Sequence, residues 1–182
     1  MYDEGRKPWV NTNGARISFD RPYSLYVNNL PSEFHPLSNG AGEFFLWEFP
    51  LAFWLEREGY DVTYISNTDT HADAAGLLRS KIFLSVGHDE YWTHQMFQNV
   101  TQARDAGVNL MFLSGNSISG TVYLDPASDG APNRITGRLP ERMFQNEEEL
   151  MGNKSYGVGY GDIAIRNADH WVFEGTGIQE GD

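Results

Sequence analysis

The clearest pattern of apolar and polar positions lies in the middle of the chain, where short apolar runs alternate with amphipathic stretches. Residues 82–86 form an apolar run of the kind found in a strand whose sheet is covered by helices on both faces. Apolar residues then recur with the period of a helix between an N-cap at Thr93 and a stop at Gly107. The face of this helix that is expected to point inward carries Trp92, Met96, Val100 and Ala103.

Three more segments extend this alternation. Residues 42–58 are apolar on nearly every face and predict a buried helix, which is kinked by Pro50 or starts near Phe49. Residues 61–65 and 108–113 are rich in β-branched and large apolar side chains and are expected to be strands. Helices and strands that alternate at this spacing predict an α/β fold with a doubly wound parallel sheet. The aromatic side chains expected in its core are Trp47, Phe53, Trp54 and Trp92.

The length and composition fit one domain with one packed core, since the chain has 182 residues of which 40% are hydrophobic. Residues 1–40 are rich in proline and predict an irregular N-terminal segment. Residues 41–120 hold the predicted α/β core. Residues 121–182 are rich in Gly, Asp and Asn and predict a loop-rich extension with short strands.

The charge and the lack of cysteine exclude several classes of function. A formal net charge of −12 would repel nucleic acid and an anionic membrane surface, so neither is an expected partner. No apolar run approaches the roughly 18 residues that suggest a membrane span. Without cysteine the chain forms no disulfide, thiolate nucleophile or sulfur-ligated metal site, and a cytoplasmic location is expected.

Ionisable side chains cluster directly after the apolar run at 82–86. His88, Asp89 and Glu90 follow its closing glycine, and open α/β sheets bind their ligands outside the carboxyl ends of the strands. Glu90 could therefore ligate a hard metal ion or act as a general base. The alternative is that Asp89 and Glu90 only bring negative charge to the positive end of the following helix, and that His88 is a structural residue. The pattern leaves both interpretations open.

The strand predicted at 108–113 ends in a second group of polar residues. Asn116 is expected to enter the same crevice as His88, where an amide can orient a carbonyl substrate or stabilise an oxyanion. The alternative is a plain turn residue. A different hypothesis makes Ser117 the nucleophile of a serine hydrolase, with His88 as its base. It departs from the G-x-S-x-G pattern, because Ser119 stands where the last glycine belongs and His88 precedes Ser117 in the chain.

Three blocks of sequence carry a resemblance to a known family. Residues 40–64, 85–92 (SVGHDEYW) and 106–116 (AGVNLMFLSGN) resemble, in this order, the catalytic domain of the large subunit of the N,N-dimethylformamidase family. The resemblance implies a class I glutamine amidotransferase-like fold, a three-layer sandwich, without the amidotransferase cysteine. It also implies an amidohydrolase that cleaves N,N-dimethylformamide to dimethylamine and formate. The implied cofactor is a mononuclear iron ion, Fe3+, held by two tyrosines and one glutamate.

Carried over residue by residue, the resemblance makes Glu90 the glutamate ligand and places His88 and Asn116 beside the metal. Tyr2 corresponds to one tyrosine ligand, and the second would lie upstream of this chain. His88 would then move a proton to the leaving amine, and Asn116 would hold the substrate oxygen or the attacking water.

The missing tyrosine also bears on the organisation of the protein. The chain is expected to be part of a larger catalytic subunit, incomplete at both ends, that acts on a small amide together with a small subunit and a homologous large subunit. The alternative from another class of function is a non-catalytic fragment that keeps the fold and contacts other chains.

Overall fold

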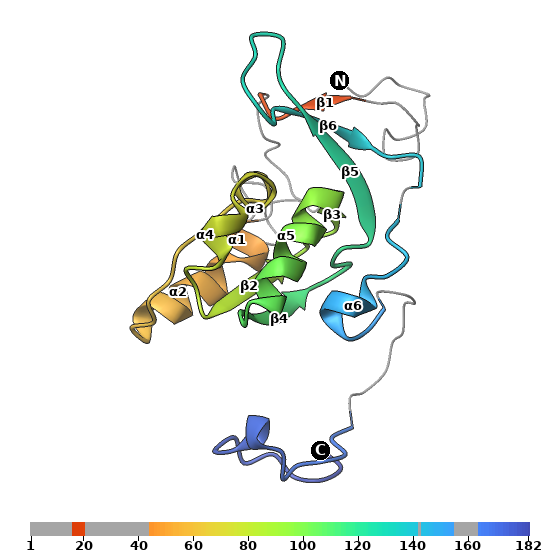
Figure 1. Ribbon diagram of the computed structural model, residues 1–182. Helices are drawn as coiled ribbons and strands as arrows, with labels where there is room; N and C mark the ends of the chain where they lie inside the picture. The colour runs from red at the N-terminus through yellow and green to blue at the C-terminus, as the bar shows by residue number, and fades with distance from the viewer. Residues whose placement is uncertain (1–15, 21–43, 142, 155–163) are drawn as a thin grey trace, which may run out of the picture.

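The computed structural model describes residues 16–20, 44–141, 143–154 and 164–182 (Figure 1). These residues form a mixed α/β structure with one sheet of two parallel strands and one sheet of four strands. The elements follow in the order β1 (Ile17–Ser18), α1 (Phe44–Trp47), α2 (Phe49–Arg57), α3 (Asn67–Ala72), α4 (Ala74–Leu77), β2 (Ile82–Gly87), β3 (Tyr91–Trp92), α5 (His94–Asp105), β4 (Asn109–Ser114), β5 (Gly120–Asp125), β6 (Ile135–Arg138), α6 (Glu148–Met151) and a 3-10 turn at Trp171–Phe173.

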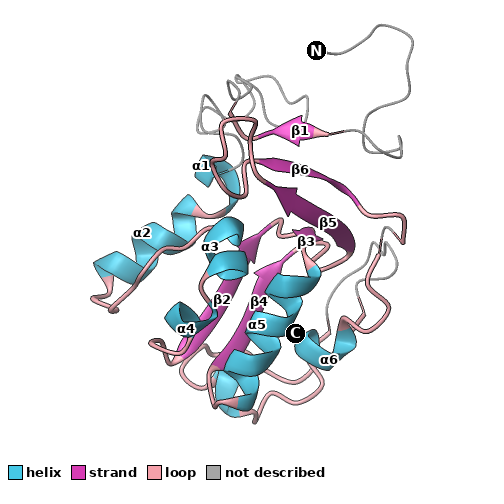
Figure 2. Cartoon of the chain, turned by 45° about the horizontal axis from the view of Figure 1, so that its top comes forward, coloured by secondary structure: helices cyan, strands magenta, loops and turns pink. Residues whose placement is uncertain are grey.

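Strands β2 and β4 lie side by side and run parallel, and their last paired residues are Gly87 and Ser114 (Figure 2). They confirm the strands predicted at 82–86 and 108–113 to within one residue. Because both strands run in the same direction, their carboxyl ends reach the same edge of the sheet. Whatever follows Gly87 and Ser114 therefore starts from neighbouring points.

Helix α5 is also predicted correctly, including its start. The Thr93 side chain caps it, because Oγ1 accepts a hydrogen bond of 3.0 Å from the backbone N–H of Met96. Helices α3 and α4 pack against it. The side-chain amide of Asn99 donates to the carbonyl oxygens of Thr70 and His71 at 2.8 and 3.0 Å, which ties α3 to α5.

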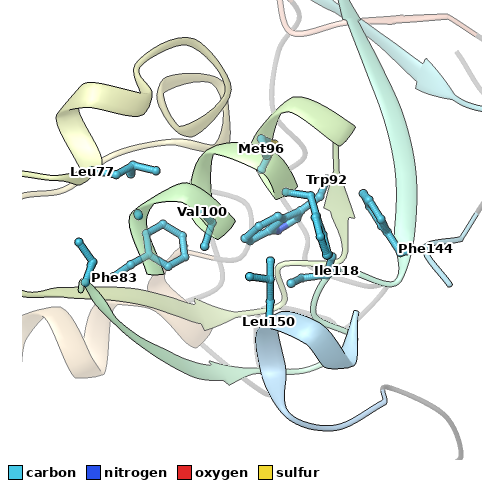
Figure 3. Close-up of a cluster of buried hydrophobic side chains, with 11 residues drawn as sticks. Leu77, Phe83, Trp92, Met96, Val100, Ile118, Phe144 and Leu150 are labelled. Carbon is cyan, nitrogen blue, oxygen red and sulfur yellow. The ribbon is translucent and has the colours of Figure 1, made fainter. Parts of the chain in front are cut away.

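The main core lies between α5 and the β2–β4 pair (Figure 3). Trp92 is completely buried, and its ring meets that of Phe83 edge-on with the centroids 6.1 Å apart. Ile118 from the turn after β4, Phe144 from the segment before α6 and Leu150 of α6 close this core. Met96, Val100 and Ala103 confirm the predicted inward face of the helix, since each is at most 1% exposed. Trp92, predicted on the same face, is buried but lies in β3, before the helix starts.

The four-stranded sheet has the order β1–β6–β5–β3. Strand β5 runs parallel to β3, with Gly120 opposite Tyr91, and antiparallel to β6, with Val122 opposite Arg138. These strands confirm the prediction of short strands after residue 120. The sheet brings Arg138 to the side of the residues that follow β2.

Other parts of the predicted fold are corrected by the structure. Residues 61–65 are no strand, because they pair with no other strand in the described part of the chain, and the Tyr64 hydroxyl instead donates to Glu56 at 2.7 Å. High β propensity favours extended backbone, but a strand also needs a neighbour. The doubly wound sheet, the three-layer sandwich and the glutamine amidotransferase-like fold are not confirmed; the coarser α/β class is. The division of the chain at residues 40 and 120 stays a prediction.

The helix predicted at 42–58 is divided into α1 and α2. Helix α2 starts at Phe49 with Pro50 in its first turn, which agrees with one of the two predicted alternatives. It has no buried residue, and Trp47, Phe53 and Trp54 are 45%, 55% and 41% exposed. The prediction that these three aromatic side chains belong to the core is wrong, because the described residues leave their outer side uncovered.

Candidate functional site

The site starts at Gly87, the last residue of β2. Its φ of 86° is in the region that favours glycine, and an added Cβ would lie 2.8 Å from Glu48 Oε1 and 2.9 Å from Trp47 Cβ. At the same edge the backbone N–H of Gly115 donates to the Gly87 carbonyl oxygen at 2.9 Å. The turns that carry His88 and Asn116 are therefore held together by their own backbones.

His88 and Asn116 are brought into contact, as the sequence predicts. Asn116 Nδ2 lies 3.1 Å from His88 Nε2. An amide NH2 group only donates, so Nε2 accepts, and neutral His88 carries its proton on Nδ1. Asn116 has a φ of 51°, a left-handed conformation that asparagine adopts more readily than most residues. This backbone conformation turns its amide back toward the imidazole.

Glu90 lies between His88 and the guanidinium group of Arg138. Glu90 Oε2 is 3.6 Å from His88 Nε2, and Glu90 Oε1 is 3.4 Å from Arg138 Nη2. The Glu90 side chain is 20% exposed, so it is accessible to a small ligand while remaining largely shielded from water. The two oxygens thus have different surroundings: Arg138 faces Oε1, and His88 faces Oε2.

Tyr91 completes the cluster from strand β3. Its hydroxyl accepts a hydrogen bond of 2.8 Å from Arg138 Nη2, and the Arg138 guanidinium carbon lies 4.8 Å from the centre of its ring. Burial raises the pKa of the Tyr91 hydroxyl, and the hydrogen bond from Arg138 acts in the opposite direction. Gly120 leaves the space for this ring, since a Cβ there would lie 2.7 Å from Tyr91 Cδ1.

Asp89 has a structural role. Its carboxylate accepts hydrogen bonds from the Ser85 hydroxyl and the Asn67 amide, both at 2.8 Å, and its backbone N–H donates to Ser114 Oγ at 2.8 Å. These bonds join the ends of β2 and β4 to the start of α3. The first turn of α5 contains no acidic residue. The interpretation that Asp89 and Glu90 merely charge the start of that helix is therefore wrong.

Ser117 does not have the geometry of a nucleophile. Its side chain is buried at 2% exposure, and Oγ donates to the Ser114 carbonyl oxygen at 3.2 Å. After β4 the left-handed conformation occurs at Asn116 and Ile118, on either side of Ser117 and not at Ser117 itself. The chain then continues through a turn into β5 without the helix that follows a nucleophile elbow. The geometry therefore gives the serine hydrolase hypothesis no support.

A metal at this cluster would have Glu90 as its ligand. Carboxylate oxygen is a hard donor that suits Fe3+, and Glu90 Oε2 faces away from Arg138 toward His88. Within the described ranges no three His, Cys, Asp or Glu residues are grouped so that they could hold a metal ion. Tyr2, the predicted tyrosine ligand, lies outside those ranges. The described residues of the cluster therefore offer one carboxylate, that of Glu90, as a hard donor for such an ion.

For two residues of the cluster, Tyr91 and Arg138, the sequence predicts no role. Tyr91 has a signal, because it directly follows Glu90 in a run of polar residues. Arg138 has none, because it lies 48 residues beyond Glu90 in a segment without a clear period. Only the pairing of β3, β5 and β6 brings it to the site.

A comparison with known protein families shows the family to which the chain belongs. The family described as N,N-dimethylformamidase beta subunit-like, C-terminal, matches residues 1–182, which is the whole chain. The chain therefore belongs to this family. A search of curated proteins gives no significant match. In the part of the chain that the structure describes, no helix has the length and apolar character needed to cross a membrane.

Proposed function

We propose that this member of the N,N-dimethylformamidase beta subunit-like family is an iron-dependent amidohydrolase. Its proposed substrate is a small N-substituted formamide such as N,N-dimethylformamide, which it would cleave to formate and dimethylamine. The observation that supports this most directly is the convergence of Glu90, His88 and Asn116 at the shared carboxyl edge of β2 and β4. Membership of the family supports the reaction class.

Glu90, His88 and Asn116 each have a chemical task in this proposal. Glu90 would hold the iron through Oε2, with Tyr2 as a proposed second ligand. Iron bound there would supply Lewis acidity, which polarises a carbonyl and acidifies water. A tertiary amide resists hydrolysis because resonance reduces the electrophilicity of its carbonyl carbon, so both effects address the main barrier.

The remaining tasks are proton transfer and orientation. In the hydrolysis, a water oxygen attacks the carbonyl carbon and loses a proton, the C–N bond breaks, and the leaving nitrogen gains that proton. His88 Nε2, which accepts a hydrogen bond from Asn116, could take up the proton that the water loses and pass it to the amine. Asn116 Nδ2 would donate a hydrogen bond to the substrate oxygen or the water once His88 Nε2 is protonated.

The assembly and location of the enzyme belong to the same proposal. The family description refers to a beta subunit, which implies an enzyme of more than one subunit. The proposed partners are a small subunit and a homologous large subunit, and the proposed location is the cytoplasm. A second candidate function is a non-catalytic domain that binds other chains. It is favoured by the exposed aromatic side chains of Trp47, Phe53 and Trp54.

Glu90→Gln in the purified protein tests the proposal against this second candidate. The measurements are iron content, the visible charge-transfer band expected of tyrosinate bound to Fe3+, and formate release from N,N-dimethylformamide. Glu90→Gln is expected to lose iron, band and turnover together, because an amide oxygen is a much weaker ligand than a carboxylate. Iron and turnover that both survive in Glu90→Gln contradict the proposal.

Glu141→Gln is the matched control for this experiment. Glu141 Oε1 lies 2.8 Å from His94 Nε2, so this variant also removes a carboxylate from a histidine–glutamate pair, but at the surface near α5. Its iron content and turnover are expected to equal those of the wild type. A wild-type protein without iron or turnover favours the non-catalytic candidate.

A further inference from the structure

Arg138 has no task in the proposed reaction, yet its guanidinium contacts both Glu90 and Tyr91. Its Nη2 lies 2.8 Å from the Tyr91 hydroxyl and 3.4 Å from Glu90 Oε1, and its guanidinium carbon lies 4.8 Å from the centre of the Tyr91 ring. The Arg138 and Glu90 side chains are 17% and 20% exposed. Water and salt therefore screen this contact less than they screen an exposed ion pair.

We propose that Arg138 is a positioning residue for Glu90. It holds Oε1 and keeps Tyr91 beside the carboxylate, so that Oε2 stays on the side of His88. The inference rests on the proposed function, in which Oε2 is the oxygen that holds the metal. Carboxylates that bind metals are commonly fixed by hydrogen bonds from neighbouring side chains, and loss of such a neighbour lowers metal affinity or activity about 10- to 100-fold.

The planar shape of the guanidinium is essential to this role. It lies over the Tyr91 ring while one of its nitrogens reaches both the Tyr91 hydroxyl and the Glu90 carboxylate. A lysine ammonium would supply the positive charge but not the flat surface and the fork of donors. Arg138→Lys therefore separates the effect of charge from the effect of position.

The first experiment measures iron binding by the purified protein, with the metal alone as the ligand. Arg138→Gln is expected to weaken iron affinity about 10- to 100-fold and to alter the visible charge-transfer band. Arg138→Lys is expected to recover only part of the affinity. Arg16→Gln is the control, because Arg16, just before β1, pairs with Asp125 of β5 at 3.1 Å but is 58% exposed. Unchanged affinity in Arg138→Gln, or full recovery in Arg138→Lys, overturns the inference.

The second experiment needs no iron and so separates this inference from the proposed function. Double-mutant cycles combine Arg138→Gln with Glu90→Gln and with Tyr91→Phe, and the urea midpoint of unfolding is measured for each variant. Residues in direct contact are expected to give shifts that do not add, whereas additive shifts in both cycles overturn the inference. If the wild type binds no iron, the proposed function fails, and these cycles alone decide whether Arg138 holds Glu90.

A further variant keeps the inference testable if Arg138→Gln does not fold. Tyr91→Phe removes only the hydroxyl that accepts the 2.8 Å hydrogen bond and leaves the ring under the guanidinium. It is expected to lower iron affinity, by less than Arg138→Gln would. If the iron affinity of Tyr91→Phe equals that of the wild type, the hydrogen bond between Arg138 and Tyr91 does not help to position Glu90. That result would overturn the inference.

Discussion

At Gly120 a single added methyl group tests the geometry of the site. Gly120 is the first residue of β5 and lies opposite Tyr91 in the β3–β5 ladder. A Cβ at this position would lie 2.7 Å from Cδ1 and 2.9 Å from Cε1 of the Tyr91 ring. Carbon atoms in contact need about 3.5 to 4.0 Å, so the ring has to move. Gly120→Ala is therefore expected to separate Tyr91 from the Arg138 guanidinium.

The expected loss of stability follows from that clash. Adding a methyl group to a filled contact costs about 1 to 3 kcal/mol. For a chain of 182 residues, each kcal/mol lowers the melting temperature by about 2 to 4 °C, so Gly120→Ala should lower it by about 2 to 12 °C. Thermal unfolding followed by circular dichroism measures this shift. Iron content and formate release from the folded protein should fall as well, because Tyr91 and Arg138 then no longer flank Glu90.

Gly115→Ala is the matched control in the neighbouring turn. A Cβ at Gly115 would have the Gly87 carbonyl oxygen and His88 Cδ2 as its nearest neighbours, both at 4.0 Å, which is ordinary contact. Its melting temperature should stay within about 2 °C of the wild type, since substitutions without a clash or a lost bond usually change stability by less than about 0.5 kcal/mol. Equal melting temperatures for Gly115→Ala and Gly120→Ala would refute the reasoning, because the Tyr91 ring would then not lie against Gly120.

Two further predictions concern α5 and its neighbour α3. Thr93→Ala removes the hydroxyl that caps α5 and should lower the free energy of unfolding, measured by urea titration, by about 1 kcal/mol. Thr93→Ser keeps the hydroxyl and should lose less stability. Equal losses in the two variants would argue against the cap. Burial lowers the pKa of His71, so the unfolded chain binds a proton more readily than the folded protein does, and stability is lost as the pH falls below about 6.5. The wild-type urea midpoint should therefore fall relative to that of His71→Gln between about pH 7.5 and 5.5, and a constant difference would contradict this assignment.

How much of the fold the sequence predicts depends on how local its causes are. Helix α5 is predicted because its cap at Thr93 and its apolar stripe lie within one segment. The comparison of Trp92 with Trp54 shows the limit. Both are predicted to be core residues of a helix, yet Trp92 lies in β3 and is fully buried, whereas Trp54 in α2 is 41% exposed. The difference is that the ring of Trp92 packs against Phe83 of β2 and Phe112 of β4, whereas the described residues bury no side chain of α2. Periodicity cannot say what lies beside a helix.

The part of the site that the sequence predicts also has local causes. His88 and Glu90 follow β2, and Asn116 follows β4. Parallel neighbouring strands place their carboxyl ends at one edge, so these side chains meet once the two strands are recognised and paired. This prediction needs only two apolar runs and the polar residues that follow each run in the chain, and both are visible in the sequence.

Arg138 could not be predicted in this way, because its position depends on strand register. It reaches Tyr91 through two ladders, in which Gly120 lies opposite Tyr91 and Arg138 lies opposite Val122. A shift of one residue between β5 and β6 would turn Arg138 to the other face of the sheet, away from the Tyr91 ring. The alternation of side chains in β6 is too short to specify that register, since the strand has four residues. The contacts of Arg138 with Tyr91 and Glu90 are therefore made across the sheet and leave no trace in the local sequence pattern.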